Sequence, residues 1–449
     1  MRALTQAGEG GVRALGLALG VATAAAYLIG SGRVFGYDSA VTFANFIATP
    51  SLLDAFAVHA QQPTIPLAQI AGNDHVLVSL IGHLIYSLTG SRSEVVYRLV
   101  PALAAGGTVG VGATALAQRF GVLAGASAAV YIATNPMFVE NSRDVRGYSL
   151  AALCGLLATV FFFGPRTRWR LVLYGTLLGL AIAAHAYAGL VLVAHVIWVL
   201  VRRSWPEFRQ LLPAWVLASL VAVAANGYIL WIDVTQHGFL PKVYDPGFPR
   251  DLLFYLLGAP SLLALGLWLS AAGLGLWAVR REPLVWATVA VVVVAAAALW
   301  LVVQPYYLYP RFFMVAVPAA AYLLAAAVKR WKVLAPVVLL GGIAGAFVAV
   351  PNYTADPLAL RQAAAIVQSS SAAGQRVCVI HSDEQVLGAY AAGGFTVVTS
   401  AEQLQSCDVV VVVSWGVVIP LRDEAARELT KARQVPAVYP TVVLERPTP

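Results

Sequence analysis

Asp38 is the residue best placed for chemistry, because it follows the first apolar segment of the chain at a short distance. That segment runs from Val12 to Gly30, with Arg2 and Arg13 at its N-terminal end. Asp38 begins a stretch of roughly sixty residues without a convincing membrane span. A carboxylate there could act as an acid or base on a substrate carried by a lipid. A simpler reading is that Asp38 caps the amphipathic helix that follows it.

The composition is that of an integral membrane protein. Hydrophobic residues make up 60% of the chain and charged residues 11%, and the mean hydropathy is +0.77. These values exclude an ordinary soluble protein. The net charge of +8 does not indicate nucleic-acid binding, because the arginines form short clusters between apolar stretches. The first apolar segment has no cleavage site after a short core, so we expect it to be retained.

Apolar stretches predict about eleven membrane spans, because each is close to the 17 to 25 residues that cross a bilayer. The predicted spans are 12–30, 99–118, 121–139, 148–164, 171–184, 186–201, 211–232, 253–279, 284–303, 312–328 and 333–351.

Basic clusters between these stretches give the topology. With eleven spans, all of them fall on the side of the N-terminus, which the positive-inside rule assigns to the cytoplasm. We therefore expect a multi-pass protein of the inner (plasma) membrane with its C-terminal domain outside. The clusters are Arg119, Arg166 to Arg170, Arg202–Arg203 with Arg209, Arg280–Arg281, and Lys329 to Lys332.

The segment His75 to Thr89 is apolar but has only 15 residues. Counting it as a span would place every basic cluster outside, and its length fits an interfacial or re-entrant helix. We therefore predict a transmembrane domain over 1–351, in which 31–98 is one extracytoplasmic region. Helices near 38–48 and 75–89 would lie at the membrane surface.

Basic residues in the predicted outer loops oppose the positive-inside bias and need a physical reason. Together they favour an anionic ligand, because arginine makes bidentate contacts with phosphate. Arg143 could instead pair with Glu140, and Arg146 could pair with Asp144 in the same way. The basic residues predicted to bind phosphate are Arg143, Arg146, Lys242, Arg250 and Arg311.

Residues 352–449 have a different pattern, in which strands and helices alternate. They predict a small parallel α/β domain, more suited to packing or acceptor docking than to a second catalytic site. An oxidising compartment permits a disulfide between Cys378 and Cys407. The predicted elements are helices 357–371, 383–392 and 421–433 and strands 376–380, 395–398, 409–414 and 437–446.

Three segments, in their order along the chain, resemble the GT-C membrane glycosyltransferases, in the branch of protein O-mannosyltransferases and aminoarabinose transferases. The first is GNDHVLVSLIGHLIYSLTGSRSEVVYRLVPALAAG, from Gly72 to Gly106. The second is NPMFVENSRDVRGYSLAAL, from Asn135 to Leu153, and the third is YLYPRFFMVAVPAAAYLLA, from Tyr307 to Ala325. The resemblance covers about residues 12–330.

This resemblance implies an enzyme that moves a sugar, with inversion, from a polyprenyl-phosphate carrier to a cell-envelope glycan, lipid or protein. Mannose and arabinose are the sugars it favours. Asp38 matches the catalytic acid of the family, and Arg146 and Asp144 are in register with an arginine and a glutamate of its outer loop. Ser39 stands where relatives often carry a second acid, so no metal site is evident, although a divalent cation is compatible with the pattern.

The remaining candidate residues are expected to line the substrate site. Tyr309 could equally belong to an interfacial aromatic belt, and the seven histidines show no zinc-binding spacing. No firm cofactor is implied. The residues expected to line the substrate are Tyr37, Asp74, His75, Asp144, Tyr148 and Tyr309.

Two other functions would use the same features. A transporter or flippase of lipid-linked saccharides would bind phosphate through the same arginines without catalysis. Such proteins more often show an internal repeat with broken helices in matching halves, which this chain does not show. A non-catalytic scaffold of an envelope-assembly complex would leave the placement of Asp38 without a physical reason.

Overall fold

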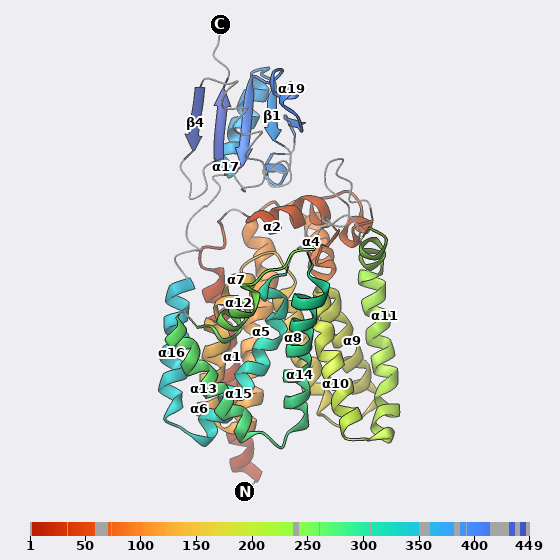
Figure 1. Cartoon of the computed structure of the whole chain (residues 1–449), viewed down its shortest axis with the longest axis vertical. Coiled ribbons are helices and arrows are strands. Elements are labelled where there is room, and N and C mark those ends of the chain that lie inside the picture. Colours follow the sequence, from red (N-terminus) through yellow and green to blue (C-terminus); the bar gives the residue numbers. More distant parts are fainter. Residues whose placement is uncertain are drawn as a thin grey trace.

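The protein consists of a helix bundle and a small sheet domain beyond one end of it, while the N-terminus lies at the other end (Figure 1). This arrangement is seen in a computed structural model. It describes residues 2–33, 35–58, 71–72, 74–236, 242–259, 261–305, 308–349, 360–380, 387–391, 393–413, 431–435 and 441–445.

Long helices of the bundle fall on the predicted apolar stretches. Five helical stretches are long and apolar enough to cross a membrane, and a bent pair would be a sixth, among the described residues. The protein is thus a multi-pass membrane protein, and the count of eleven spans stays a prediction. The helices are α1 (Arg2–Leu28), α5 (Glu94–Phe120), α6 (Val122–Thr134), α8 (Tyr148–Phe162), α9 (Arg168–Ala184), α10 (Gly189–Val201), α11 (Trp205–Gln236), α13 (Leu262–Ala278), α14 (Pro283–Ala298), α15 (Val317–Arg330) and α16 (Leu334–Ala349).

Two predicted spans are interrupted in the structure. The stretch 121–139 divides between α6 and α7 (Pro136–Asn141), where Asn135 is extended and its side chain caps the new helix at the Phe138 amide. The stretch 253–279 divides between α12 (Phe248–Leu257) and α13, which meet at an angle of 68°. Gly258 ends α12 with φ of 67°, a backbone conformation that glycine adopts readily. Hydropathy does not reveal such breaks.

Helices α1 and α5 pack closely through small residues. A Cβ atom added to Gly20 would lie 2.7 Å from the Gly106 carbonyl oxygen, and one added to Gly110 would lie 2.9 Å from the Gly16 carbonyl oxygen. Such close approach between helices is typical of small residues in membrane proteins. It fixes the end of α1, from which the chain continues to Asp38.

Short helices cover the end of the bundle that faces the sheet domain (Figure 1). The predicted helix near 38–48 is present as α2 (Tyr37–Thr42) and the π-helix η1 (Phe43–Ile47), and the helix at 75–89 is present as α4 (Val76–Thr89). Phe43 and Ile47 are fully buried in a core shared with α4 and α5. Shorter turns complete this end: η2 (Leu52–Phe56), η3 (Ala186–Ala188), η5 (Leu299–Val303) and η6 (Pro310–Ala316).

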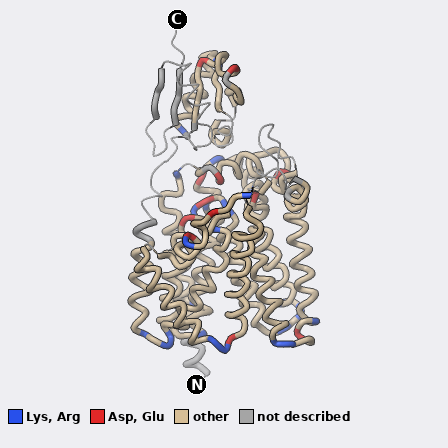
Figure 2. Tube along the Cα trace, in the orientation of Figure 1, with Lys and Arg blue, Asp and Glu red and all other residues tan. Residues whose placement is uncertain are grey.

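Charged residues lie mainly at the two ends of the bundle. Figure 2 shows Lys and Arg gathered at the end where the N-terminus lies, and charges of both signs toward the opposite end. The predicted basic clusters lie at the ends of α5, α8, α10, α13 and α15. They therefore share one end of the bundle, as the span count requires.

The sheet domain differs in part from its prediction. Strands β2, β1 and β3 are parallel, but β5 is antiparallel to both β3 and β4, in the order β2-β1-β3-β5-β4. The wholly parallel sheet was therefore wrong. Cys378 and Cys407 form a disulfide inside the domain. The elements are α17 (Leu360–Ala372), β1 (Val377–Ile380), β2 (Thr396–Val398), α19 (Ala401–Leu404), β3 (Val409–Val413), β4 (Lys431–Val435) and β5 (Thr441–Glu445).

The predicted helix 421–433 is wrong at its end, because Lys431 to Arg433 belong to β4. Residues 421–430 lie outside the described residues, as does part of the predicted helix 383–392. An antiparallel strand pair needs only a short connection, which the prediction of alternating helices and strands overlooked.

Candidate active site

Asp38 lies in the first turn of α2 and faces two arginines. Its Oδ2 atom accepts a hydrogen bond from Arg311 Nη2 at 2.8 Å and lies 3.8 Å from Arg146 Nη2. Gly36 occupies the N-cap of α2, and no side chain caps this helix. The interpretation of Asp38 as a helix cap is therefore wrong, and its side chain is held by ion pairs.

Three segments distant in the sequence meet at this carboxylate. Arg146 lies in the turn between α7 and α8, and its Nη1 donates to Thr42 Oγ1 of α2 at 3.3 Å. The neighbouring Val145 amide donates to Ser39 Oγ at 3.1 Å. Arg311 is the second residue of η6 and stacks on the Tyr309 ring at 4.3 Å. These contacts place both guanidinium groups against α2.

The two arginines decide the charge of Asp38. Burial disfavours its ionised form, but the positive charges of Arg146 and Arg311 outweigh burial and lower the pKa of the Asp38 carboxyl. Asp38 is therefore ionised at neutral pH. Its side chain keeps 30% of its surface exposed, so a ligand can approach it.

A second polar group, formed by Tyr148, His75 and His185, lies close to Arg146. The Arg146 guanidinium stands 6.0 Å from the ring of Tyr148, which in turn contacts His75 and His185 at ring distances of 4.9 and 4.6 Å. His75 Nδ1 lies 3.0 Å from the Ala184 carbonyl oxygen. Since a carbonyl oxygen only accepts hydrogen bonds, Nδ1 carries the proton and Nε2 is left as an acceptor.

Burial keeps this second group and Asp74 neutral. It raises the pKa of Asp74 to about 8, although the hydrogen bond from Ser79 and the charge of Arg146 act in the opposite direction. Burial, reinforced by Arg146, lowers the pKa of His75 well below its usual value and that of His185 to about 3. Near Arg146, the Asp38 carboxyl is thus ionised and the Asp74 carboxyl is protonated at neutral pH. Such opposite protonation states are common in acid–base sites.

Arg143 and Asp144 contact other partners than those considered from the sequence. Arg143 donates to the Ile29 carbonyl oxygen at the end of α1, and Asp144 accepts a hydrogen bond from Arg33 at 3.4 Å. Arg146, for its part, forms an ion pair with Asp38 at 3.8 Å. Arg143 and Asp144 thus support the segment that leads to Asp38.

The structure does not bring all predicted residues together. Lys242 is exposed on the segment before α12. Arg250 is exposed in the first turn of α12, where it pairs with Asp251 at 2.9 Å. Among the described residues, neither forms an ion pair with Asp38. The Tyr37 side chain lies outside what the structure describes. The residues gathered around Arg146 and Arg311 are Asp38, Asp74, His75, Tyr148 and Tyr309.

Several residues of the site were missed by the sequence analysis. His185 stacks on His75 at 5.2 Å, and Tyr187 and Phe312 continue this aromatic wall at 5.0 Å from each other. Burial also raises the pKa of Glu140 to about 7. A histidine in a tight turn between apolar stretches was the one signal for His185. No group of three or more metal-ligating side chains occurs in the described residues.

No protein-family model and no curated protein sequence matches the chain. Two crystal structures of ArnT from Cupriavidus metallidurans share its fold. The apo structure is 16% identical, with a TM-score of 0.60 over 95% of this chain and 97% of that one. The structure bound to undecaprenyl phosphate is 15% identical, with a TM-score of 0.60 over 96% and 97%.

A crystal structure of the oligosaccharyltransferase from Archaeoglobus fulgidus shows lower similarity. It is 13% identical, with a TM-score of 0.46 over 97% of this chain and 73% of that one. The two ArnT structures cover both the helix bundle and the C-terminal sheet domain. The chain therefore has the fold of these ArnT structures, which fits the resemblance to the GT-C membrane glycosyltransferases that its sequence features indicated.

Proposed function

We propose that the protein is an inverting glycosyltransferase that moves a sugar from a polyprenyl-phosphate carrier to an acceptor in the cell envelope. The observation that carries this proposal is the ionised Asp38 carboxylate held between Arg146 and Arg311 at one end of the bundle. The ArnT fold supports it, since one ArnT structure contains undecaprenyl phosphate. Mannose and arabinose are the sugars that we propose to test first.

In the proposed reaction, Asp38 acts as the general base. The acceptor hydroxyl attacks the anomeric carbon while its proton passes to Asp38. The bond between the anomeric carbon and the phosphate oxygen breaks, and its electron pair leaves with the polyprenyl phosphate. Attack from the face opposite this bond inverts the configuration. Arg146 and Arg311 stabilise the charge that develops on the phosphate.

The ion pairs also account for how Asp38 would become a base. A carboxylate whose pKa is lowered by two arginines is a weak base. A carrier phosphate that draws Arg311 and Arg146 toward itself would weaken this attraction. Because burial opposes ionisation of Asp38, its pKa would then rise. Binding of the donor would thus raise the pKa of Asp38, so that Asp38 is the strongest base when the donor is bound.

The proposed reaction takes place on the extracytoplasmic side. The basic clusters at the N-terminal end of the bundle favour the cytoplasm there, and the Cys378–Cys407 disulfide favours an oxidising compartment at the other end. We propose 1–351 as the transmembrane domain, including the loop 31–98, and 352–449 as an extracytoplasmic domain. Lys242 and Arg250 would attract the carrier lipid through their exposed charges.

Topology can be tested with cysteines introduced at exposed positions of opposite ends. In a Cys154→Ala background, Ser93→Cys should react with a membrane-impermeant reagent in intact cells. Arg281→Cys should react after the cells are opened. Both positions are exposed in the structure. The reverse pattern would place the site on the cytoplasmic side and refute this part of the proposal.

The reaction is tested with the purified full-length protein in lipid nanodiscs. Polyprenyl-phosphate mannose and arabinose are supplied with an extract of envelope acceptors, and release of polyprenyl phosphate is measured. We expect release that depends on acceptor and on Asp38. If labelled carrier crosses vesicle membranes with its sugar still attached, and no release occurs, the chain is a flippase and the transferase assignment is wrong.

A further inference from the structure

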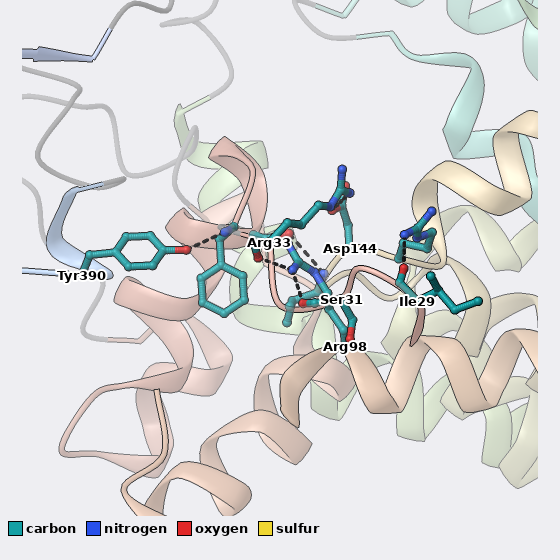
Figure 3. Close-up of polar contacts among 10 residues, drawn as sticks. Ile29, Ser31, Arg33, Arg98, Asp144 and Tyr390 are labelled. Carbon is teal, nitrogen blue, oxygen red and sulfur yellow. Dashed lines mark hydrogen bonds and ion pairs between the residues drawn. The ribbon is translucent and has the colours of Figure 1, made fainter. Parts of the chain in front are cut away.

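The segment from Ile29 to Phe35, which joins α1 to the helix of Asp38, is held by side chains from three directions. Arg98 of α5 donates to the carbonyl oxygens of Ser31 and Arg33. Only 1% of Arg98 is exposed, so a charged group is buried to hold the backbone of this segment. Figure 3 shows these contacts together with those of Ile29 and of Arg33 with Asp144.

The third set of contacts with this segment comes from the sheet domain. The Phe35 amide donates to the Tyr390 hydroxyl at 2.5 Å, and Figure 3 shows Tyr390 reaching this segment from the sheet domain. The Glu94 carboxylate lies beside the same hydroxyl, where burial and the charge of Glu94 both act to raise the pKa of Tyr390. Arg361 of α17 donates to Glu94 at 2.6 Å and to the Gly32 carbonyl oxygen at 2.6 Å. The sheet domain thus binds directly to the backbone before Asp38.

The Phe35 amide is close to Asp38 along the chain. Phe35 is fully buried, and its ring lies 5.2 Å from Phe43 and 5.5 Å from the Arg98 guanidinium carbon. Gly36 follows as the N-cap of α2, whose first hydrogen bond joins the Ala40 amide to the Gly36 carbonyl oxygen at 2.9 Å. Displacing Phe35 therefore displaces the first turn of α2, which carries Asp38.

We propose that Tyr390 of the sheet domain and Arg98 of α5 are positioning residues, which hold the 29–35 segment so that Asp38 faces Arg146 and Arg311. The sheet domain then contributes to catalysis through its contacts with this segment. This proposal rests on the catalytic role of Asp38 proposed above. The contacts of Tyr390 and Arg98 with the 29–35 segment do not depend on that role.

The test uses the full-length protein with Tyr390→Phe, which removes the hydroxyl and keeps the ring. Tyr228→Phe on α11 is the matched control, because no hydrogen bond of the Tyr228 hydroxyl is found in the described residues. Three quantities are measured: kcat and KM for the polyprenyl-phosphate sugar, the acid limb of the pH profile of kcat/KM, and hydrogen exchange of a peptide spanning 36–43.

We expect Tyr390→Phe to lower kcat about fivefold, which corresponds to about 1 kcal/mol, with KM for the donor within about twofold. The acid limb should move to higher pH, because a looser Asp38 loses part of the attraction that lowers its pKa. Hydrogen exchange across 36–43 should become faster. Arg98→Met should change all three quantities in the same direction, because it removes the Nη1 donor that both carbonyl oxygens share.

Two outcomes would overturn the proposal. A Tyr390→Phe protein that melts at lower temperature, yet keeps the parent's acid limb and exchange across 36–43, would give Tyr390 a purely structural role. Changes of equal size in Tyr228→Phe would do the same. If the parent transfers no sugar from either carrier, the proposed function fails, and exchange across 36–43 then decides by itself whether Tyr390 holds the Asp38 helix.

Discussion

Arginines at the two ends of the helix bundle differ in their surroundings. At the N-terminal end, Arg13 and Arg119 keep 70% and 55% of their side chains exposed and pair with glutamates at the surface. At the opposite end, Arg146 keeps 6% exposed, and Arg98 and Arg143 are also buried. Exposed pairs contribute little to stability, whereas a buried charge is costly unless its partners are in place.

The difference separates two uses of the same residue. Exposed arginines indicate which side of the membrane a loop occupies, and their individual contacts contribute little to stability. The arginines of the opposite end, of which Arg33 and Arg311 are half-buried, form a network. In it, Arg146 and Arg311 hold Asp38, while Arg98, Arg143 and Arg33 hold the segment before it. Substitutions at one end should therefore change activity, and matched substitutions at the other end should not.

The largest effect is expected for Asp38→Asn. The variant keeps the size of the side chain but loses the basic carboxylate, and a positioned base typically contributes about 10²–10⁴-fold to the rate. We expect transfer to fall at least about 100-fold, with folding and carrier binding retained. Carrier binding is measured with a labelled polyprenyl phosphate. Transfer within a few-fold of the parent would refute Asp38 as the base.

The next effect tests the comparison directly, with Arg146→Lys and Arg311→Lys against Arg119→Lys. Lysine keeps the charge but cannot reproduce a forked contact with phosphate. We expect kcat to fall by about 10-fold to 100-fold at the two site arginines, somewhat less than the loss typical when a charge stabiliser is removed. Arg119→Lys should keep the parent rate. Equal rates in all three variants would remove the distinction between the two ends.

Much of the fold could be predicted from sequence because a bilayer imposes a single length scale. Apolar stretches of the right length marked the helices, and the basic clusters marked which of their ends share a side. The breaks at Asn135 and Gly258 depend on local backbone geometry and were missed. The antiparallel β5 was missed because short strands carry little information about their direction.

The candidate site was predictable only in part. Asp38, Arg146 and Arg311 could be chosen because each lies in a loop where its charge is unusual. Arg98 lies at the edge of an apolar stretch, where an arginine is common, so its burial beneath the Asp38 segment was not foreseen. His185 and Tyr390 take their roles from packing between α4 and α9 and between domains, and no spacing in the sequence indicates such contacts.

A smaller effect is expected from the protonated carboxyl group of Asp74. Burial raises its pKa from 3.8 to about 8, so the folded protein binds this proton more tightly than the unfolded chain. Its contribution to stability is present below pH 4 and is lost as the pH rises toward 8. Asn resembles the protonated carboxyl group. Asp74→Asn should therefore reduce the change in melting temperature between pH 4 and pH 8 by an amount on the order of a few °C.

The control for this experiment is Asp251→Asn, whose carboxyl group is 42% exposed and pairs with Arg250. Its melting temperature should follow the parent's dependence on pH. We also expect Asp74→Asn to keep transfer at neutral pH within about threefold of the parent, since Asn retains the hydrogen-bonding shape. A large loss of transfer, together with an unchanged Asp38→Asn, would make Asp74 the base instead.

The smallest effect is expected from Lys242→Ala and Arg250→Ala. These variants test whether exposed basic residues at the outer end contribute to activity. Both side chains belong to the outer end, but they are exposed like the arginines of the other end. If they attract the carrier phosphate, their removal should raise KM by about two- to fivefold without changing kcat, as exposed charges contribute up to about 1 kcal/mol. The effect should shrink when salt is raised, because salt screens exposed charges. Arg281→Ala is the control at the opposite end. A KM unchanged at low salt in both variants would confine carrier binding to Arg146 and Arg311 beside Asp38.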